Sequence, residues 1–139
     1  MESSDLFEMI EDLVDKAGLL LVDMTEKNIG RSHMIRLLVD RPGRINIAEC
    51  AKLSRMIKDS IEANMLLMNY RLEVSSPGIG RLLSTEVDWV RSIGRKLSVK
   101  MVDGNFIDWL EEYSNGCLKF RKDRIVTADD IVSAVEVLE

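Results

Sequence analysis

Residues 70–81 read YRLEVSSPGIGR, and this stretch marks the point where one part of the chain ends and another begins. Apolar and charged side chains alternate along its first five residues, which predicts a strand with one buried face. Ser75 and Ser76 follow, and their hydroxyls can bond to nearby backbone groups. Pro77 presets φ, and Gly78 can take the positive φ that other residues avoid. The stretch therefore predicts a strand that ends in a rigid bend.

The residues before this stretch carry helical and strand patterns in turn. In chain order they predict a helix over 6–17, strands over 19–26 and 33–40, and a helix over 47–61, ahead of the strand over 70–74. The second helix has an apolar stripe that includes Ile47, Ile57 and Ile61, and Asn46 with Glu49 matches a capping box at its start. We expect an N-terminal α/β domain with its helices on one face of a three-stranded sheet.

The residues after the bend have a different pattern. Thr85 and Asp88 form the capping pair of a short linking helix over 85–93. Short apolar segments separated by turn residues then predict strands over 96–102, 106–112, 117–120, 125–126 and 135–138. Five short strands in so few residues suit a small β-barrel, which closes on itself and so hides its edges. The fold class is therefore α+β, with expected domains at 1–83 and 84–139.

The 139 residues carry a net charge of −5 and a sequence pI near 5.0, but the charges are segregated along the chain. Residues 1–26 are mostly acidic, whereas residues 27–58 are mostly basic and residues 89–102 contain four basic side chains and no acid. Such strips can meet phosphate even in an acidic protein, or they can simply be a solvated surface. Apolar runs of only four residues exclude a membrane span, and the acidic start of the chain does not match a secretory signal, so we expect a cytoplasmic protein.

Residue types that carry catalysis or bind metal do not occur in recognisable patterns. The chain has a single histidine, His33, which we expect to be a sheet residue, and it contains no GxSxG, GxGxxG or Walker A sequence. Cys50 and Cys117 are too far apart for a zinc motif. We therefore expect no enzyme, no metal and no cofactor. A hydrolase that used Ser76 or His33 is the least favoured alternative.

The stretch over residues 70–81 resembles the signature of the ribosome maturation factor RimP family, in which a strand of the form LEVSSPG leads into a short charged turn. The resemblance extends upstream through residues 18–55 and downstream to the IGRKL sequence at 93–97 and to residues 128–137. Two positions depart from the family pattern. Gly80 stands where the family has Asp, and Leu82 stands where it has Pro.

The resemblance implies a non-enzymatic assembly factor required for maturation of the small (30S) ribosomal subunit. It implies binding to the immature particle, through a ribosomal protein near the decoding region and through 16S rRNA. It also implies that the C-terminal domain is an SH3- or Sm-like barrel. We expect a monomer that uses no small-molecule substrate and no membrane.

Candidate contact residues come from the signature bend and from the basic segment that follows it. They are Ser75, Ser76, Pro77, Gly78, Arg81, Arg91, Arg95, Lys96 and Lys100. The bend can also be purely structural, a corner between the sheet and the linker. The alternative function is an SH3-like peptide- or RNA-binding module without a ribosomal role. For that module the barrel offers the aromatic residues Phe106, Trp109, Tyr113 and Phe120.

Overall fold

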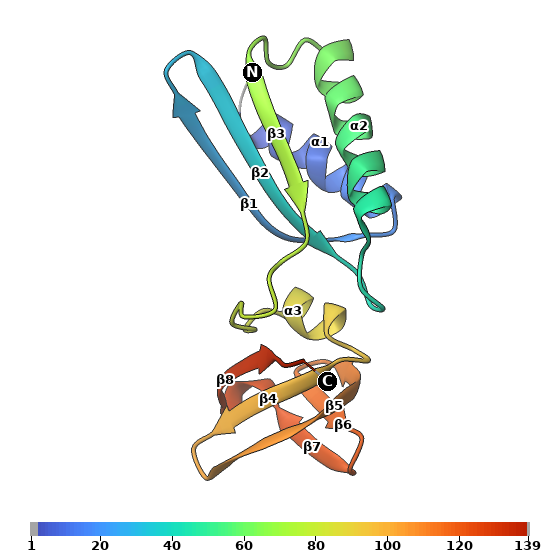
Figure 1. Ribbon diagram of the computed structural model, residues 1–139, viewed down its shortest axis with the longest axis vertical. Coiled ribbons are helices and arrows are strands. Elements are labelled where there is room, and N and C mark those ends of the chain that lie inside the picture. The colour runs from blue at the N-terminus through green and yellow to red at the C-terminus, as the bar shows by residue number, and fades with distance from the viewer. Residues whose placement is uncertain (1–2, 139) are drawn as a thin grey trace. The chain divides into compact units, whose positions relative to one another are not determined.

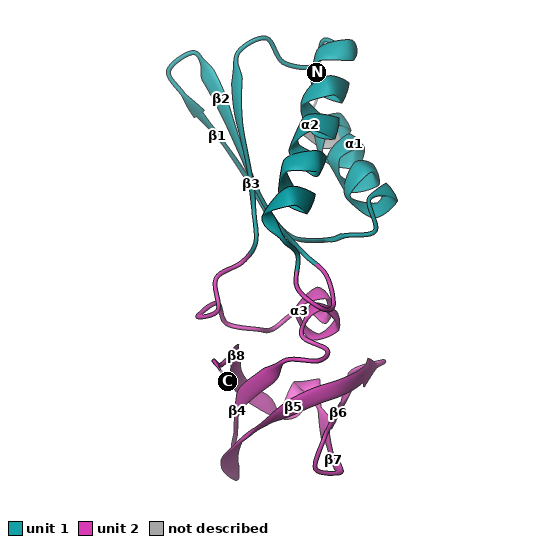
Figure 2. Ribbon diagram, turned by 45° about the vertical axis from the view of Figure 1, so that its right-hand side comes forward, with its two compact units in different colours: residues 1–40, 45–76 teal, residues 41–44, 77–139 magenta. Residues whose placement is uncertain are grey.

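The computed structural model describes residues 3–138, with side chains from residue 5 onward (Figure 1). The chain separates into two compact units (Figure 2). Unit 1 comprises the residues up to 40 together with 45–76, and unit 2 comprises residues 41–44 and the chain from residue 77 on. No helix within residues 3–138 is long and apolar enough to cross a membrane.

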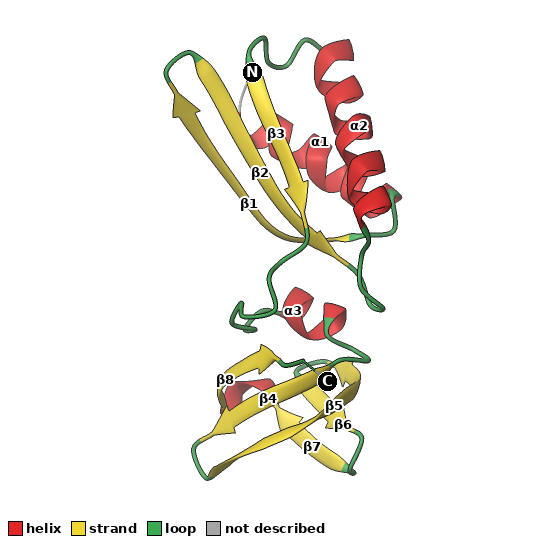
Figure 3. Cartoon of the chain, in the orientation of Figure 1, coloured by secondary structure: helices red, strands yellow, loops and turns green. Residues whose placement is uncertain are grey.

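Unit 1 is a three-stranded sheet with both of its helices on one face (Figures 1 and 3). Its elements are α1 (Ser3–Lys16), β1 (Leu20–Ile29), β2 (Ser32–Asp40), α2 (Ile47–Ala63) and β3 (Tyr70–Ser75). The order in the sheet is β1-β2-β3, with β1 antiparallel and β3 parallel to β2. Helix α2 makes the crossover that a parallel pair requires. The predicted helix–strand–strand–helix–strand order is confirmed.

Alternation along the central strand β2 builds the core of unit 1. Ile35, Leu37 and Val39 on this strand are completely buried. They pack in one cluster with apolar side chains of both helices, which include Leu6, Ile10 and Val14 of α1 and Leu53, Ile57 and Ile61 of α2. Burying a side chain of this size contributes about 1.5–3 kcal/mol relative to leaving it in water. The sheet and the helices therefore hold each other in place.

The apolar stripe predicted for α2 is wrong at its first residue. Ile47 is 89% exposed, whereas Leu53, which the predicted stripe omits, is buried. The buried stripe is centred on Ile57, and Ile47 lies about 80° around the helix axis from that centre. The capping box of Asn46 and Glu49 is confirmed, with amide hydrogen bonds of 2.8 and 3.1 Å.

The β1–β2 hairpin is longer than the sequence pattern predicts. Its polar connection was expected over residues 27–32, but the strands pair almost to the tip and leave a turn at Gly30 and Arg31. Gly30 takes a φ of 62°, which accounts for glycine there. The imidazole of His33 lies 2.7 Å from the side-chain oxygen of Asn28 across the hairpin. These cross-strand contacts extend the pairing into a segment that hydropathy alone assigns to a loop.

Unit 2 contains one short helix and a five-stranded antiparallel sheet of order β7-β6-β5-β4-β8. Its elements are α3 (Glu86–Arg91), β4 (Lys96–Met101), β5 (Gly104–Ser114), β6 (Cys117–Phe120), β7 (Arg124–Thr127), the 3₁₀ turn η1 (Ala128–Asp130) and β8 (Ile131–Glu136). No pairing between β7 and β8 is found within residues 3–138, so the described arrangement is a sheet with two edges.

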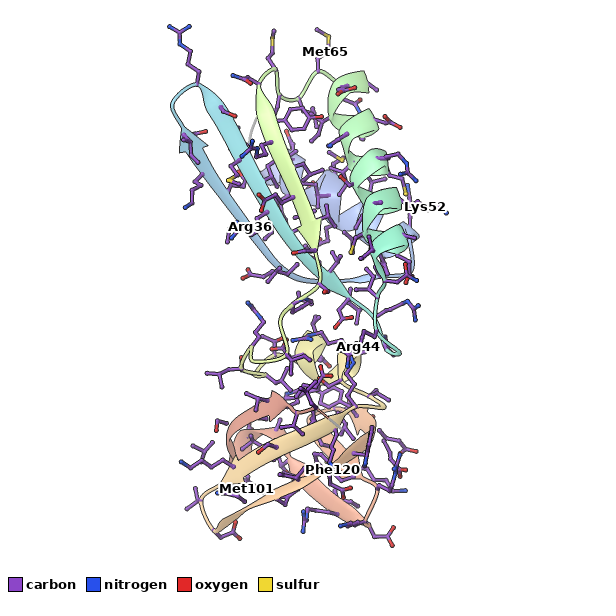
Figure 4. The ribbon with its side chains drawn as sticks, viewed as in Figure 1. Arg36, Arg44, Lys52, Met65, Met101 and Phe120 are labelled. Atoms are coloured by element: carbon purple, nitrogen blue, oxygen red, sulfur yellow. The ribbon has the colours of Figure 1, made fainter. Side chains whose placement is uncertain are left out.

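The core of unit 2 is a second apolar cluster, separate from that of unit 1. Phe120 lies in the interior (Figure 4), with Leu97, Leu110 and Leu118 also completely buried in the same cluster. Trp89 of α3 is 3% exposed and packs there, which confirms that it is a core residue. The predicted last strand, residues 135–138, is wrong in its bounds. Strand β8 begins at Ile131, since its pairing with β4 runs along most of that strand.

The passage from unit 1 to unit 2 falls at Ser76 and Pro77, a few residues before the expected boundary. Leu83 explains the difference, because its side chain is 4% exposed within the core of unit 2. Its amide also donates to the carbonyl of Ala134 at 2.9 Å. Residues 77–83 therefore contact unit 2, whereas the division into domains at 1–83 and 84–139 stays a prediction.

Two glycines of unit 2 are expected to respond oppositely to the same substitution. Gly80 has no positive φ and no neighbour within 4 Å of an added Cβ, so Gly80→Ala should raise the free energy of unfolding by about 0.4–1 kcal/mol. Gly94 has a φ of +88°, so Gly94→Ala should lower it by about 1–2 kcal/mol. Urea unfolding of the full chain, followed by tryptophan emission, measures both. Equal destabilisation by the two substitutions would contradict the prediction.

Candidate binding surface

The signature corner, the bend over residues 75–81, is largely exposed, but its backbone conformation differs from the predicted one. Ser75, Ser76 and Gly78 are exposed, and Pro77 is half-buried. Gly78 does not have a positive φ, so the expected left-handed glycine is wrong. The chain turns instead because the carbonyl of Gly78 accepts a hydrogen bond from the amide of Arg81 at 3.2 Å. The chain therefore makes a β-turn over residues 78–81, and the two exposed serines precede this turn at the end of strand β3.

A pocket of about 620 Å³ lies in unit 1 beside the two serines. Its lining comes from the start of α2 and the end of β3, and consists of Ile45, Asn46, Ile47, Ala48, Cys50, Val74, Ser75 and Ser76. Burial raises the pKa of the Cys50 thiol, and the carboxylates of Glu49 and Asp40 raise it further. A thiol that keeps its proton is a poor nucleophile. The chemistry of this pocket favours apolar contact over covalent catalysis.

Two of the predicted contact residues, Arg91 and Arg95, are buried within unit 2. Arg91 is 3% exposed and pairs with Asp88 at 3.1 Å. Arg95 is 6% exposed, donates to the carbonyl of Arg41 at 2.9 Å and lies 3.6 Å from Glu136. Glu136 also pairs with Arg44. The basic segment after the bend is thus not one exposed strip, because these two arginines hold unit 2 together.

The remaining predicted residues of the segment stay accessible. Lys100 is exposed, and Lys96 and Arg81 are half-exposed. Lys96 and Lys100 alternate along β4 with the completely buried Leu97 and Val99, so both lysines lie on the outer face of the strand. In the β4–β5 ladder Lys96 stands directly opposite Trp109. The structure thereby brings a predicted contact lysine beside one of the aromatic residues of unit 2.

Asp88 fixes the start of α3 and the arginine behind it. Its carboxylate accepts hydrogen bonds from the amides of Ser84 and Thr85, at 2.9 and 3.1 Å, and from Arg91 Nε at 3.1 Å. Burial alone would raise the pKa of Asp88, but these amides and the Arg91 guanidinium together bring it below its ordinary value of 3.8. The predicted capping pair of Thr85 and Asp88 is confirmed.

Sequence reasoning missed the basic turn between β6 and β7. Lys119, Arg121, Lys122 and Arg124 are all exposed, and the pattern indicated only a charged turn there. The spacing could have indicated this basic turn, since four cations lie within six residues after a strand rich in aromatic residues. Among residues 3–138, no three His, Cys, Asp or Glu side chains gather in a way that could hold a metal ion.

The described residues define a two-unit α+β protein in which two exposed serines stand where the chain passes from one unit into the other. Residues 9–80 match the family model of the RimP N-terminal domain. This match covers more than half of the 139 residues and includes the second half of α1, the whole three-stranded sheet, α2 and the signature corner. The chain therefore belongs to the RimP family, a family of ribosome maturation factors.

Asp88→Asn should lower the stability of unit 2 at neutral pH by about 1–3 kcal/mol, because Arg91 then loses its buried carboxylate. The pKa of Asp88 is lower in the folded than in the unfolded chain. Its contribution to stability is therefore fully present above pH 3.8 and is lost as the pH falls through the folded-state pKa.

Urea unfolding at neutral pH and at pH 3–4 measures this contribution, with Asp103→Asn on an exposed turn as the control. The difference between wild type and Asp88→Asn should shrink in acid, whereas a difference independent of pH would contradict the assignment.

Proposed function

We propose that this chain is a non-enzymatic assembly factor that binds the immature small (30S) ribosomal subunit and promotes its maturation. The observation that carries the proposal is the family match over residues 9–80, which ends at the exposed signature corner. The protonated thiol in the pocket beside that corner also suits a binding role.

The mechanism that we propose is differential binding. A factor that binds one conformation of a growing ribonucleoprotein more tightly than another shifts the population toward that conformation. No bond has to form or break for this to happen. The protein can therefore act on each particle and then dissociate unchanged.

The charge of the chain suits two kinds of partner on the subunit. Five acidic side chains of α1 are exposed, namely Asp5, Glu8, Glu11, Asp12 and Asp15. They can face a basic ribosomal protein near the decoding region, while basic residues elsewhere face 16S rRNA. For the second contact we propose the signature corner, Ser75, Ser76, Pro77 and Gly78, with Arg81, Lys96 and Lys100 beside it in the sequence. Arg91 and Arg95 support that surface from the interior of unit 2.

We further propose that the five-stranded sheet of unit 2 is the framework of an SH3- or Sm-like barrel. Its meander of short antiparallel strands, and the 3₁₀ turn before the last strand, support this assignment. A cytoplasmic monomer without cofactor or small-molecule substrate remains the expectation that accompanies the ribosomal role.

The alternative, an SH3-like module that binds proline-rich peptides, has less support. Such grooves need several exposed aromatic side chains in a row. Phe120 is completely buried, and Phe106 packs edge-on against it with ring centroids 5.0 Å apart. Trp109 and Tyr113 are only half-exposed. The aromatic residues of unit 2 therefore serve its core more than a peptide groove.

Sucrose-gradient fractionation tests the proposed function. The tagged protein should sediment with free small subunits and not with complete ribosomes. The triple variant Arg81→Glu, Lys96→Glu, Lys100→Glu should reduce this fraction roughly tenfold, the effect of about 1.4 kcal/mol in binding.

The matched control reverses three exposed charges on the outer face of α2, from which Lys52 projects away from the sheet (Figure 4). It carries Lys52→Glu, Arg55→Glu and Lys58→Glu and should sediment like wild type. Equal loss in both triple variants would mean that net charge, and not the proposed surface, decides binding. Absence of the wild-type protein from the small-subunit fractions would refute the proposed function itself.

A further inference from the structure

The turn between β6 and β7 concentrates positive charge on unit 2. Nine lysines and arginines lie between residues 77 and 138, and four of them fall within residues 119–124. All four are exposed, whereas Arg91 and Arg95 are buried. Asp123 is the only acid within the turn itself. Residues 119–124 therefore carry a net charge of +3, and the exposed Glu111 and Glu112 of β5 lie beside them.

Two of these cations are stacked on aromatic rings of β5. The guanidinium carbon of Arg121 lies 4.8 Å from the centroid of the Trp109 ring, and that of Arg124 lies 3.9 Å from the centroid of Phe106. Arg121 is also 3.7 Å from a carboxylate oxygen of Glu111, with its side chain 56% exposed. A guanidinium that is already stacked loses less conformational entropy when it binds a ligand. Both arginines are thus held in place before any partner arrives.

A buried carboxylate holds the backbone of the turn. Asp108 is 3% exposed, and its two oxygens accept hydrogen bonds from the amides of Trp109 at 2.7 Å and Lys122 at 3.0 Å. The amide of Arg121 donates to the carbonyl of Trp109 at 2.9 Å. Burial alone would raise the pKa of Asp108, but the amides of Lys122 and Trp109 and nearby positive charge bring it below its ordinary value. The turn is therefore a fixed feature of the sheet.

The outer face of β4 and β5 continues this surface. Trp109 stands opposite Lys96 in the ladder, and Lys100 lies further along the same face of β4. A stacked guanidinium group, a half-exposed indole and flanking lysines together match the chemistry of single-stranded RNA, whose bases stack on planar groups and whose phosphates accept from arginine. The Arg124–Phe106 pair lies on the other face of the sheet, because Phe106 pairs with buried Val99 and Arg124 with buried Phe120. An acidic protein would use the charges of the outer face but would have no need of the stacked Arg121–Trp109 pair.

We propose that the surface formed by Trp109, Lys119, Arg121 and Lys122 binds single-stranded RNA, with a base stacked at the Arg121–Trp109 pair and phosphates on the flanking cations. This inference rests on the proposed function, for which it supplies an RNA contact separate from the signature corner. It adds a binding surface that the sequence pattern did not indicate.

Binding of a fluorescein-labelled single-stranded RNA of mixed sequence to the full chain tests the proposal. The double variant Lys119→Glu, Arg121→Glu should bind at least roughly tenfold more weakly. Its slope of log affinity against log salt should become shallower by about 0.7, since about 0.7 is lost for each phosphate contact to a single strand and Arg121 is assigned to a base. The matched control Lys52→Glu, Arg55→Glu makes the same change of charge on α2 and should bind like wild type.

Tryptophan emission gives a second and local readout. RNA should quench wild-type emission and should not quench Trp109→Phe, whose remaining Trp89 is buried in the core. If the double variant of the basic turn fails to fold, Lys119→Glu with Lys122→Glu tests the same surface through side chains that are exposed.

The proposal is overturned if RNA does not bind, or if the α2 control variant weakens binding as much as the double variant of the basic turn. It is also overturned if quenching persists in Trp109→Phe. Competition by polyglutamate as effective as that by unlabelled RNA would assign the surface to an acidic protein instead. If RNA does not bind but the protein still sediments with small subunits, this proposal fails and the proposed function stands. If RNA binds but the protein does not sediment with small subunits, the RNA surface stands and the proposed function fails.

Discussion

Two buried carboxylates organise the surfaces that unit 2 presents. Asp88 and Asp108 are each 3% exposed, and each accepts hydrogen bonds from two backbone amides. Leaving a buried charge without such donors costs several kcal/mol, so the backbone must keep its position around each carboxylate. Asp88 sets the start of α3, and Asp108 sets the basic turn between β6 and β7. Asp108 therefore places exposed cations, whereas the arginine that Asp88 holds is itself buried.

Local signals in the sequence predicted most of the elements, while packing decided the details. The strand over Tyr70–Ser75 follows from strict alternation, and the capping box at Asn46 follows from two residues whose side chains bond to each other's amides. The parallel pairing of β2 with β3 joins segments separated by a whole helix, and no local pattern reports it. Ile47 shows the same limit of local patterns. The spacing of apolar residues places it on the predicted stripe of α2, but its side chain is exposed.

The candidate surface was only partly predictable, because composition does not reveal burial. Arg91 and Arg95 read as members of a basic strip, yet each finds a carboxylate within unit 2 and becomes part of the interior. Lys100 occurs in the same segment and stays exposed because it alternates with core residues along a strand. The stacking of Arg121 on Trp109 depends on a turn folding back across a sheet, a relation that spacing along the chain does not contain.

The two cysteines are distributed one to each unit, and their environments differ. Cys117 lies exposed on β6, whereas Cys50 is half-buried in unit 1 with a raised pKa. A maleimide dye should therefore label Cys117 first, because its thiol is more accessible and the raised pKa of Cys50 lowers the thiolate fraction of that residue. A second dye can then be attached to Cys50 under more forcing conditions. The natural chain thus offers a donor and an acceptor position for energy transfer, by which the separation of the two units can be followed in solution without introducing any new thiol.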